Sequence, residues 1–209
     1  PTWVSPNRIQ SATRAHESGA TIALCDDAHQ HHRLQKNLSF LVVDGPYGIG
    51  NANLLPAGPL REPWFNALQR TDAIILIGPD TKNLTANLAL PIFRATLAPT
   101  SDTAFLTTTP WLAFAGIGRP EKFYDTLRAH NATLTATHDF PDHHTYSDAD
   151  LESLTQATTH NARLITTEKD WVKLPLSWQQ TVTYLPIELR FDDPTAIETF
   201  LRTHLAKPS

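Results

Sequence analysis

The chain has 209 residues, of which 41% are hydrophobic and 18% charged, a composition typical of one large or two small globular domains. Its formal net charge of −4 provides no overall basic field, so we expect no nucleic-acid partner. The single cysteine, Cys25, excludes an intrachain disulfide, and no apolar run approaches the roughly 18 residues of a membrane span.

The first half of the chain carries the pattern of an α/β protein. A polar, alanine-containing stretch at 7–17 predicts a helix, and the continuous apolar runs at 20–25, 38–44 and 73–78 predict strands. Residues 84–95 predict a further helix, interrupted near Pro91. Because the strands are apolar throughout rather than alternating, we expect a sheet that is covered on both faces.

A stretch rich in Thr and Pro at 100–111 separates this half from a second α/β pattern. We expect a domain boundary or hinge there, with short strands at 104–107 and 111–115. The elements predicted after it are helices at 121–130, 147–160 and 194–205 and strands at 133–137, 164–167 and 182–187, with Ser147 as N-cap of the second helix. The predicted parts are a first lobe at 1–103, a β linker at 104–115 and a C-terminal α/β lobe at 116–209.

Two acids, Asp26 and Asp27, end the first predicted strand. Magnesium takes hard oxygen ligands and keeps several waters, so one or two carboxylates at a strand end are enough to hold it. A solvated turn at the end of a strand is the alternative, because Asp is common in such turns.

Three histidines and an arginine follow the acids at His29, His31, His32 and Arg33. They could bind an anionic phosphate, or a metal through imidazole, and they also suit an ordinary exposed turn. A zinc site is conceivable here, but the sequence does not show the four ligands that zinc requires.

The run Leu54–Pro63 is a stiff loop that ends in two charged residues. Pro56 and Pro59 restrict it, and Gly58 allows close approach to a ligand. Arg61 can grip a phosphate with its planar fork, and Glu62 can accept from a hydroxyl or support a metal. The alternative is a rigid structural loop with an internal Arg61–Glu62 pair.

Three further motifs carry polar groups in the second half. Gly116-Ile117-Gly118-Arg119-Pro120 precedes a helix, where backbone N–H groups can bind an anion. In 140–146, His143 follows a carboxylate and could act as a base, but the residues by themselves favour a surface turn that caps the next helix. In 166–174, Lys169 could approach phosphates, or the segment could form an internal charged pair beside a core Trp171.

Together these motifs resemble the tetraacyldisaccharide 4′-kinase (lipid A 4′-kinase) family over essentially the whole chain. The family's Asp-Asp-Gly-Phe/Leu-Gln-His is matched by 26–31, with Ala28 in place of Gly and His29 in place of an apolar residue. Its Gly-Asn and Leu-Pro-Ala-Gly-Pro-Leu-Arg-Glu-Pro are matched at 50–51 and 55–63. The phosphate-binding loop Gly-x-x-x-x-Gly-Lys-Ser/Thr occurs nowhere in these 209 residues, so we expect the chain to be the downstream part of a longer protein.

The resemblance implies a P-loop-kinase-like α/β/α lobe without its N-terminal part, and a smaller α/β lobe joined to it by a short β linker. It implies ATP and Mg²⁺ as cofactors, a lipid A disaccharide precursor as partner, and a place at the cytoplasmic face of the bacterial inner membrane. It implies that Asp26 and Asp27 hold the metal, and that Asp27 and His143 are catalytic, with His143 assisting an aspartate upstream of residue 1. The residues that it implies for substrate or phosphate binding are Gln30, His31, Asn51, Arg61, Glu62, Arg119 and Lys169.

The activity that the resemblance implies is transfer of the γ-phosphoryl group of ATP to the 4′-hydroxyl of a tetraacylated glucosamine disaccharide 1-phosphate. We expect a monomer, and we expect the isolated chain to be inactive. The alternative is a non-catalytic relative that binds a nucleotide or a lipid headgroup without transfer.

Overall fold

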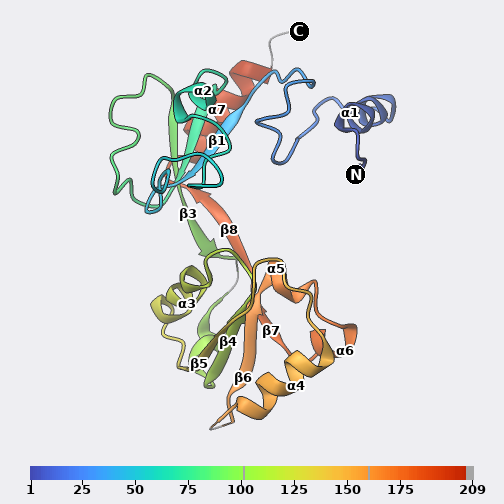
Figure 1. Cartoon of the computed structure of the whole chain (residues 1–209), viewed down its shortest axis with the longest axis vertical. Helices are drawn as coiled ribbons and strands as arrows, with labels where there is room; N and C mark the ends of the chain where they lie inside the picture. The colour runs from blue at the N-terminus through green and yellow to red at the C-terminus, as the bar shows by residue number, and fades with distance from the viewer. Residues whose placement is uncertain (101, 160, 206–209) are drawn as a thin grey trace. The chain divides into compact units, whose positions relative to one another are not determined.

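Two compact α/β units make up the computed structural model, which describes residues 1–100, 102–159 and 161–205 (Figure 1). Unit 1 comprises residues up to Thr96 together with those from Arg190 onward, and unit 2 comprises Leu97–Leu189. The α/β class predicted from the sequence is confirmed. No helix in the described ranges is long and apolar enough to cross a membrane.

Unit 1 is built on a four-stranded sheet in the order β1-β2-β3-β8. Its elements are α1 (Arg8–Glu17), β1 (Phe40–Asp44), α2 (Trp64–Leu68), β2 (Ala73–Ile77), β3 (Ile92–Pro99), β8 (Ile187–Phe191) and α7 (Pro194–Leu205). Strands β1, β2 and β3 run parallel. Strand β8 is antiparallel to β3, because Asp192 N donates to Arg94 O while Thr100 N donates to Pro186 O.

The chain passes between the units twice, within β3 and within β8. The sequence-based division placed the linker at 104–115 and everything after it in the second lobe, whereas the structure returns the end of β8 and all of α7 to unit 1. The physical reason is aromatic packing: the ring of Phe200 on α7 lies 5.9 Å from that of Phe40 and 5.1 Å from that of Phe93.

Four predicted elements differ from the structure. Residues 20–25 form no strand, and Leu24 is 99% exposed, because no strand among the described residues pairs with this segment. Residues 84–95 are not a helix: their first part is a turn in which Asp80 accepts from Leu84 N and Thr85 N, and their second part begins β3 after Pro91. Residues 104–107 form a 3₁₀ turn instead of a strand. The single strand predicted at 182–187 is divided between β7, which ends at Leu185, and β8, which begins at Ile187.

Unit 2 is a parallel sheet in the order β5-β4-β6-β7. Its elements are η1 (Ala104–Thr107), β4 (Trp111–Ala115), α3 (Pro120–Ala129), β5 (Leu134–Asp139), α4 (Asp148–Ala157), β6 (Arg163–Thr167), α5 (Glu168–Trp171), α6 (Leu176–Gln179) and β7 (Thr183–Leu185). Helix α4 begins with the predicted Ser147 cap, whose hydroxyl accepts from Asp150 N while the Asp150 carboxylate accepts from Ser147 N.

The two faces of the unit 2 sheet are both covered. Every residue of β4 is buried, and alternate residues face opposite layers. One layer joins Trp111 to Phe123 and Leu127 of α3, and the other joins Phe114 to Leu151 of α4. The covering of both faces that we expect for the strands of the first half does not hold along β1 of unit 1, where Val42 remains 57% exposed.

A buried carboxylate fixes the loops at one end of the unit 2 sheet. Asp170 is fully buried, and its Oδ2 accepts from Gly116 N (2.9 Å) and from the Thr167 hydroxyl (2.8 Å). Its Oδ1 accepts from Lys173 Nζ at 2.9 Å. Burial alone would raise the pKa of Asp170, but the hydrogen bonds from Lys173, Gly116 and Thr167 outweigh it and lower the pKa. The ionised form therefore connects the end of β4 to α5.

This network predicts a stability that depends on pH. The pKa of Asp170 is lower in the folded chain than the roughly 3.9 of an unfolded Asp, so its contribution is complete above about pH 4 and is lost as the pH falls through the folded value. We expect Asp170→Asn to lower the free energy of unfolding by about 3 kcal/mol at pH 7, and the difference from the parent chain to shrink towards pH 2.

Urea unfolding at several pH values measures this difference. The matched control is Asp125→Asn, since Asp125 forms an exposed pair with Arg128 that we expect to change stability by less than about 1 kcal/mol. An Asp170→Asn chain as stable as the parent at pH 7 contradicts the prediction.

Candidate functional site

A pocket of about 1070 Å³ opens in unit 1. Its walls come from residues 21–30, from the segment that leads into β1, from the loop before α2, and from the end of α7. Among the residues singled out from the sequence, it brings together Asp26, Asp27, Gln30, Arg61 and Glu62. His31 and Asn51 do not line it.

Asp27 and Arg61 form an ion pair at this pocket. Arg61 Nη1 lies 3.0 Å from Oδ1 and 2.9 Å from Oδ2 of Asp27, with the two side chains 58% and 59% exposed. Arg8 Nη1 donates to the backbone carbonyl of Asp27 at 2.8 Å. An exposed pair of this kind contributes about 0–1 kcal/mol, so both carboxylate oxygens remain open to exchange.

The second residue of the acid pair, Asp27, has a left-handed backbone conformation. Asp27 has φ +46°, a region that Asp tolerates better than most residues. Ala28, which stands where the family has Gly, is buried and is not among the residues with positive φ. The substitution of Ala for Gly therefore introduces no left-handed alanine.

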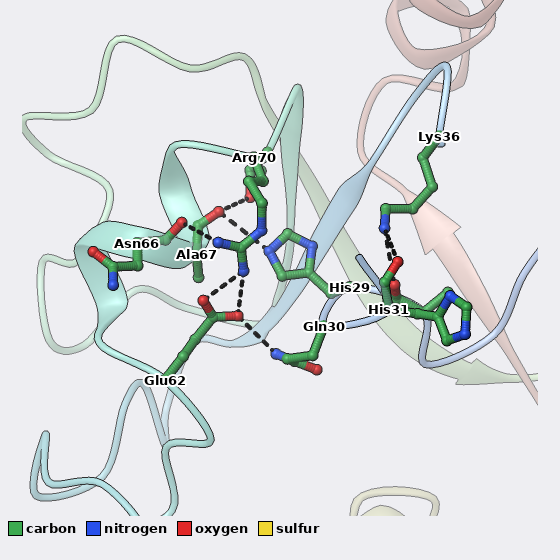
Figure 2. Close-up of polar contacts among 10 residues, drawn as sticks. His29, Gln30, His31, Lys36, Glu62, Asn66, Ala67 and Arg70 are labelled. Carbon is green, nitrogen blue, oxygen red and sulfur yellow. Dashed lines mark hydrogen bonds and ion pairs between the residues drawn. The ribbon is translucent and has the colours of Figure 1, made fainter. Parts of the chain in front are cut away.

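Glu62 is engaged with protein groups (Figure 2). Arg70 Nη2 contacts both of its carboxylate oxygens, at 2.6 Å to Oε1, and Gln30 Nε2 donates to Oε1 at 3.0 Å. The hydrogen bond from Arg70 is the main cause of a lowered pKa of Glu62, with burial opposing it and Gln30 assisting. The internal Arg61–Glu62 pair, which the sequence offered as the alternative, does not form: the observed pairs are Arg61–Asp27 and Arg70–Glu62.

The loop after the acids is fastened at several points. His29 Nε2 lies 3.2 Å from the Ala67 carbonyl oxygen, and Lys36 Nζ donates to the carbonyls of Ala28 (3.2 Å) and His31 (2.9 Å), as Figure 2 shows. The Nδ1 atoms of His29 and His31 are buried and have no hydrogen-bond partner within the described ranges. Sequence reasoning missed Lys36 and Arg70, since only the folded chain brings them to these partners.

The metal-binding interpretation can be tested on the donor set. In the described ranges, no group of three or more His, Cys, Asp or Glu side chains is arranged to hold a metal ion, so the histidines do not form a zinc cluster. Asp26 and Asp27 follow each other in sequence and both line the pocket, and one or two carboxylates suit Mg²⁺ when phosphates and waters complete its shell.

Gly58 packs closely against the Asn51 side chain within the stiff loop. Asn51 Nδ2 donates to the Ala57 carbonyl at 2.8 Å, and its Oδ1 accepts from Asn53 N at 3.1 Å. A Cβ added at Gly58 would collide with Asn51 Oδ1 and with Asn53 O. Gly58 therefore allows a close approach within the loop itself.

The remaining predicted residues lie at the carboxyl ends of the strands of unit 2. Arg119 occupies the N-cap position of α3 without a capping hydrogen bond from its side chain. His143 N donates to the Gly116 carbonyl at 3.1 Å, and Lys169 is exposed in α5 directly after β6. His143 has φ +61° and a side chain that is 74% exposed, with Nε2 3.8 Å from Asp142 Oδ2. The chain leaves β4 for β5 on one side and returns to β6 on the other, and ligands of open α/β sheets bind beside such a reversal of strand order.

For segments 140–146 and 166–174, the structure also contains the features of the structural alternatives, a helix-capping turn and an internal charged pair. Segment 140–146 leads directly into the α4 cap, where His144 Nε2 lies 3.2 Å from Asp150 Oδ2. The internal charged pair of segment 166–174 is Asp170–Lys173, with Trp171 packed against the core. The roles of His143, Arg119 and Lys169 stay predictions.

These features define an α/β protein of two units, with charged loops at the ends of parallel strands. A family model described as "LpxK: Tetraacyldisaccharide-1-P 4'-kinase" matches residues 1–206. The chain is 45% identical over 202 residues to the tetraacyldisaccharide 4'-kinase of Paramagnetospirillum magneticum, covering 94% of this chain and 62% of that protein. It is 42% identical over 208 residues to that of Rhodospirillum rubrum, covering 96% and 63%. The chain belongs to the tetraacyldisaccharide 4'-kinase family.

The fold agrees with a solved structure of the same family. It is similar, with a TM-score of 0.65 and 23% identity, to the "apo" form of LpxK from Aquifex aeolicus in complex with ATP, covering 86% of this chain and 56% of that one. At this identity the likeness shows the fold alone. The chain spans 62–65% of the length of the first curated relatives that it matches.

The Glu62 network generates a prediction that separates a structural from a ligand-binding role. Arg70→Met leaves the Glu62 side chain, which is 17% exposed, with Gln30 as its one hydrogen-bond donor among the described residues, so we expect the free energy of unfolding to fall by about 1–3 kcal/mol. Urea unfolding followed by circular dichroism measures this change. The matched control, Arg202→Met, removes an exposed pair with Glu198 and is expected to change stability by less than about 1 kcal/mol. Equal effects of the two variants contradict the structural role of Arg70.

Proposed function

We propose that the protein to which this chain belongs transfers the γ-phosphoryl group of ATP to the 4′-hydroxyl of a tetraacylated glucosamine disaccharide 1-phosphate. Membership of the family and the names of its relatives support the reaction class. The observation that carries the proposal for this chain is the pocket of unit 1, which Asp26 and Asp27 line and where Asp27 forms an ion pair with Arg61.

The proposed roles follow from the chemistry of each group. Asp26 and Asp27 would hold Mg²⁺, which neutralises charge on the phosphate oxygens when bound. Arg61 supplies a planar, permanently charged donor for phosphate. Gln30 is placed by Glu62 at the same pocket, and Glu62 acts through that contact.

The residues outside this pocket have proposed roles of a different kind. His31 is placed by the bond from Lys36 to its carbonyl, and Asn51 holds the stiff loop that presents Arg61. In unit 2, Arg119 and Lys169 offer positive charge to phosphates, and His143 offers an exposed imidazole for proton transfer.

The proposed setting is the cytoplasmic face of the bacterial inner membrane, with the lipid A disaccharide precursor as partner and the protein as a monomer. We further propose that the 209-residue chain alone does not transfer phosphate. The support for this is the sequence: it contains no Gly-x-x-x-x-Gly-Lys-Ser/Thr loop to cradle the phosphates of ATP.

The kinase proposal predicts the effect of removing one acid. In the complete enzyme, Asp27→Asn is expected to lower kcat by at least about 100-fold. The reason is that the Mg²⁺ ion, which would neutralise the charge of the transition state, would lose one of its carboxylate ligands. Because Asp27 is exposed and its ion pair contributes little, we expect the melting temperature to stay within a few degrees of the parent. Transfer of labelled phosphate from ATP to the disaccharide 1-phosphate measures turnover, and Glu198→Gln on α7 serves as the control. Normal turnover by Asp27→Asn contradicts the proposal.

A second candidate is a relative that binds a nucleotide or lipid headgroup without transfer. The departures from the family motif at Ala28 and His29 favour it. It predicts that ATP binds to the complete protein while no label reaches the disaccharide, whereas the kinase proposal requires both.

A further inference from the structure

The carboxylate of Asp27 is occupied by a side chain. One nitrogen, Arg61 Nη1, lies within hydrogen-bond distance of both carboxylate oxygens. These are the same two oxygens that a divalent cation would use. A cation and the Arg61 guanidinium therefore cannot both take the full carboxylate.

The acid next to Arg61 in sequence, Glu62, is already paired with other side chains. The neighbouring Glu62 already accepts from Arg70 Nη2 and from Gln30 Nε2. Arg61 itself lines the pocket, so a guanidinium released from Asp27 stays at the pocket with its donors available.

The pairing is easy to exchange. Both side chains are more than half exposed, and pairs of this kind change an equilibrium by no more than about fivefold. A doubly charged cation competes for the same carboxylate with a larger charge, so modest cation concentrations can displace the guanidinium.

We propose that Arg61 and a divalent cation are alternative partners of Asp27. Without the cation, Arg61 neutralises the carboxylate and holds the loop after the acids to the stiff loop at 54–63. When the cation binds, Arg61 is released and becomes a donor for the phosphate that accompanies the cation. Cation and phosphate then bind cooperatively, because each favours the state in which Arg61 has left Asp27. This inference rests on the proposed metal site.

The chain offers a matched control for this exchange. Arg8 Nη1 donates to the backbone carbonyl of Asp27, so Arg8 places positive charge beside the same residue without occupying its carboxylate. Removing either arginine reduces the repulsion of a cation, but only removal of Arg61 frees the two oxygens.

The experiment is a titration of the 209-residue chain with Mn²⁺ in 0.15 M NaCl, with free Mn²⁺ followed by electron paramagnetic resonance. We expect Arg61→Gln to bind Mn²⁺ up to about fivefold more tightly than the parent chain, Arg8→Gln to change the affinity by less than half as much, and Asp27→Asn to lose the site.

Three results overturn the exchange: equal tightening by Arg61→Gln and Arg8→Gln, which reports general electrostatics; weaker binding by Arg61→Gln; or no Mn²⁺ binding by the parent chain and Arg61→Gln alike. The kinase proposal is tested separately by the turnover of Asp27→Asn in the complete enzyme, so either idea can fail while the other stands.

Discussion

The Glu62 carboxylate is the interaction on which the arrangement of the candidate site depends. It receives Arg70 from the end of α2 and Gln30 from the loop after the acids, and so ties together two segments more than thirty residues apart in sequence. Because Glu62 is committed in this way, Arg61 is left to pair with Asp27. The pairing of Glu62 with Arg70 thus leaves Glu62 in a largely buried network and Asp27 in an exposed pair that can exchange. The neighbouring residues Arg61 and Glu62 therefore differ in their expected roles: Glu62 supports the structure, and Arg61 is a candidate for ligand binding.

Unit 2 separates its charges in the same manner. Asp170 is fully buried and satisfied by a backbone N–H, a hydroxyl and an ammonium group, which is the condition under which a buried carboxylate stabilises a fold. His143 is mostly exposed on the loop held through Gly116. The buried acid fixes the loop, and the loop presents the titratable group. Removing Asp170 therefore affects folding first, whereas removing His143 leaves that network intact.

Sequence patterns identified the elements whose signals are local. The strands at 38–44, 73–78 and 164–167 and the Ser147-capped helix all follow from apolar runs or capping residues in adjacent positions. The failures lie where tertiary pairing decides. Residues 20–25 have the composition of a strand but no described strand beside them, and residues 92–95 join a sheet although they continue a helical pattern. Arg70 and Lys36 escaped notice because nothing near them in sequence marks them, and their partners are reached only by folding.

The acid pair lies at the candidate site although the strand that was predicted to precede it does not form. The acids were predicted from a strand that would end in carboxylates, yet the structure holds their loop without that strand. His29 is fastened to α2, Gln30 to Glu62, and two carbonyls of the loop to Lys36. Asp27 itself takes the left-handed conformation, which leaves Ala28 free to be buried where a glycine is usual. The geometry of the site is therefore carried by side-chain contacts of the loop, and Arg61–Asp27, an exposed contact to a carboxylate, is one that a ligand can replace at low cost.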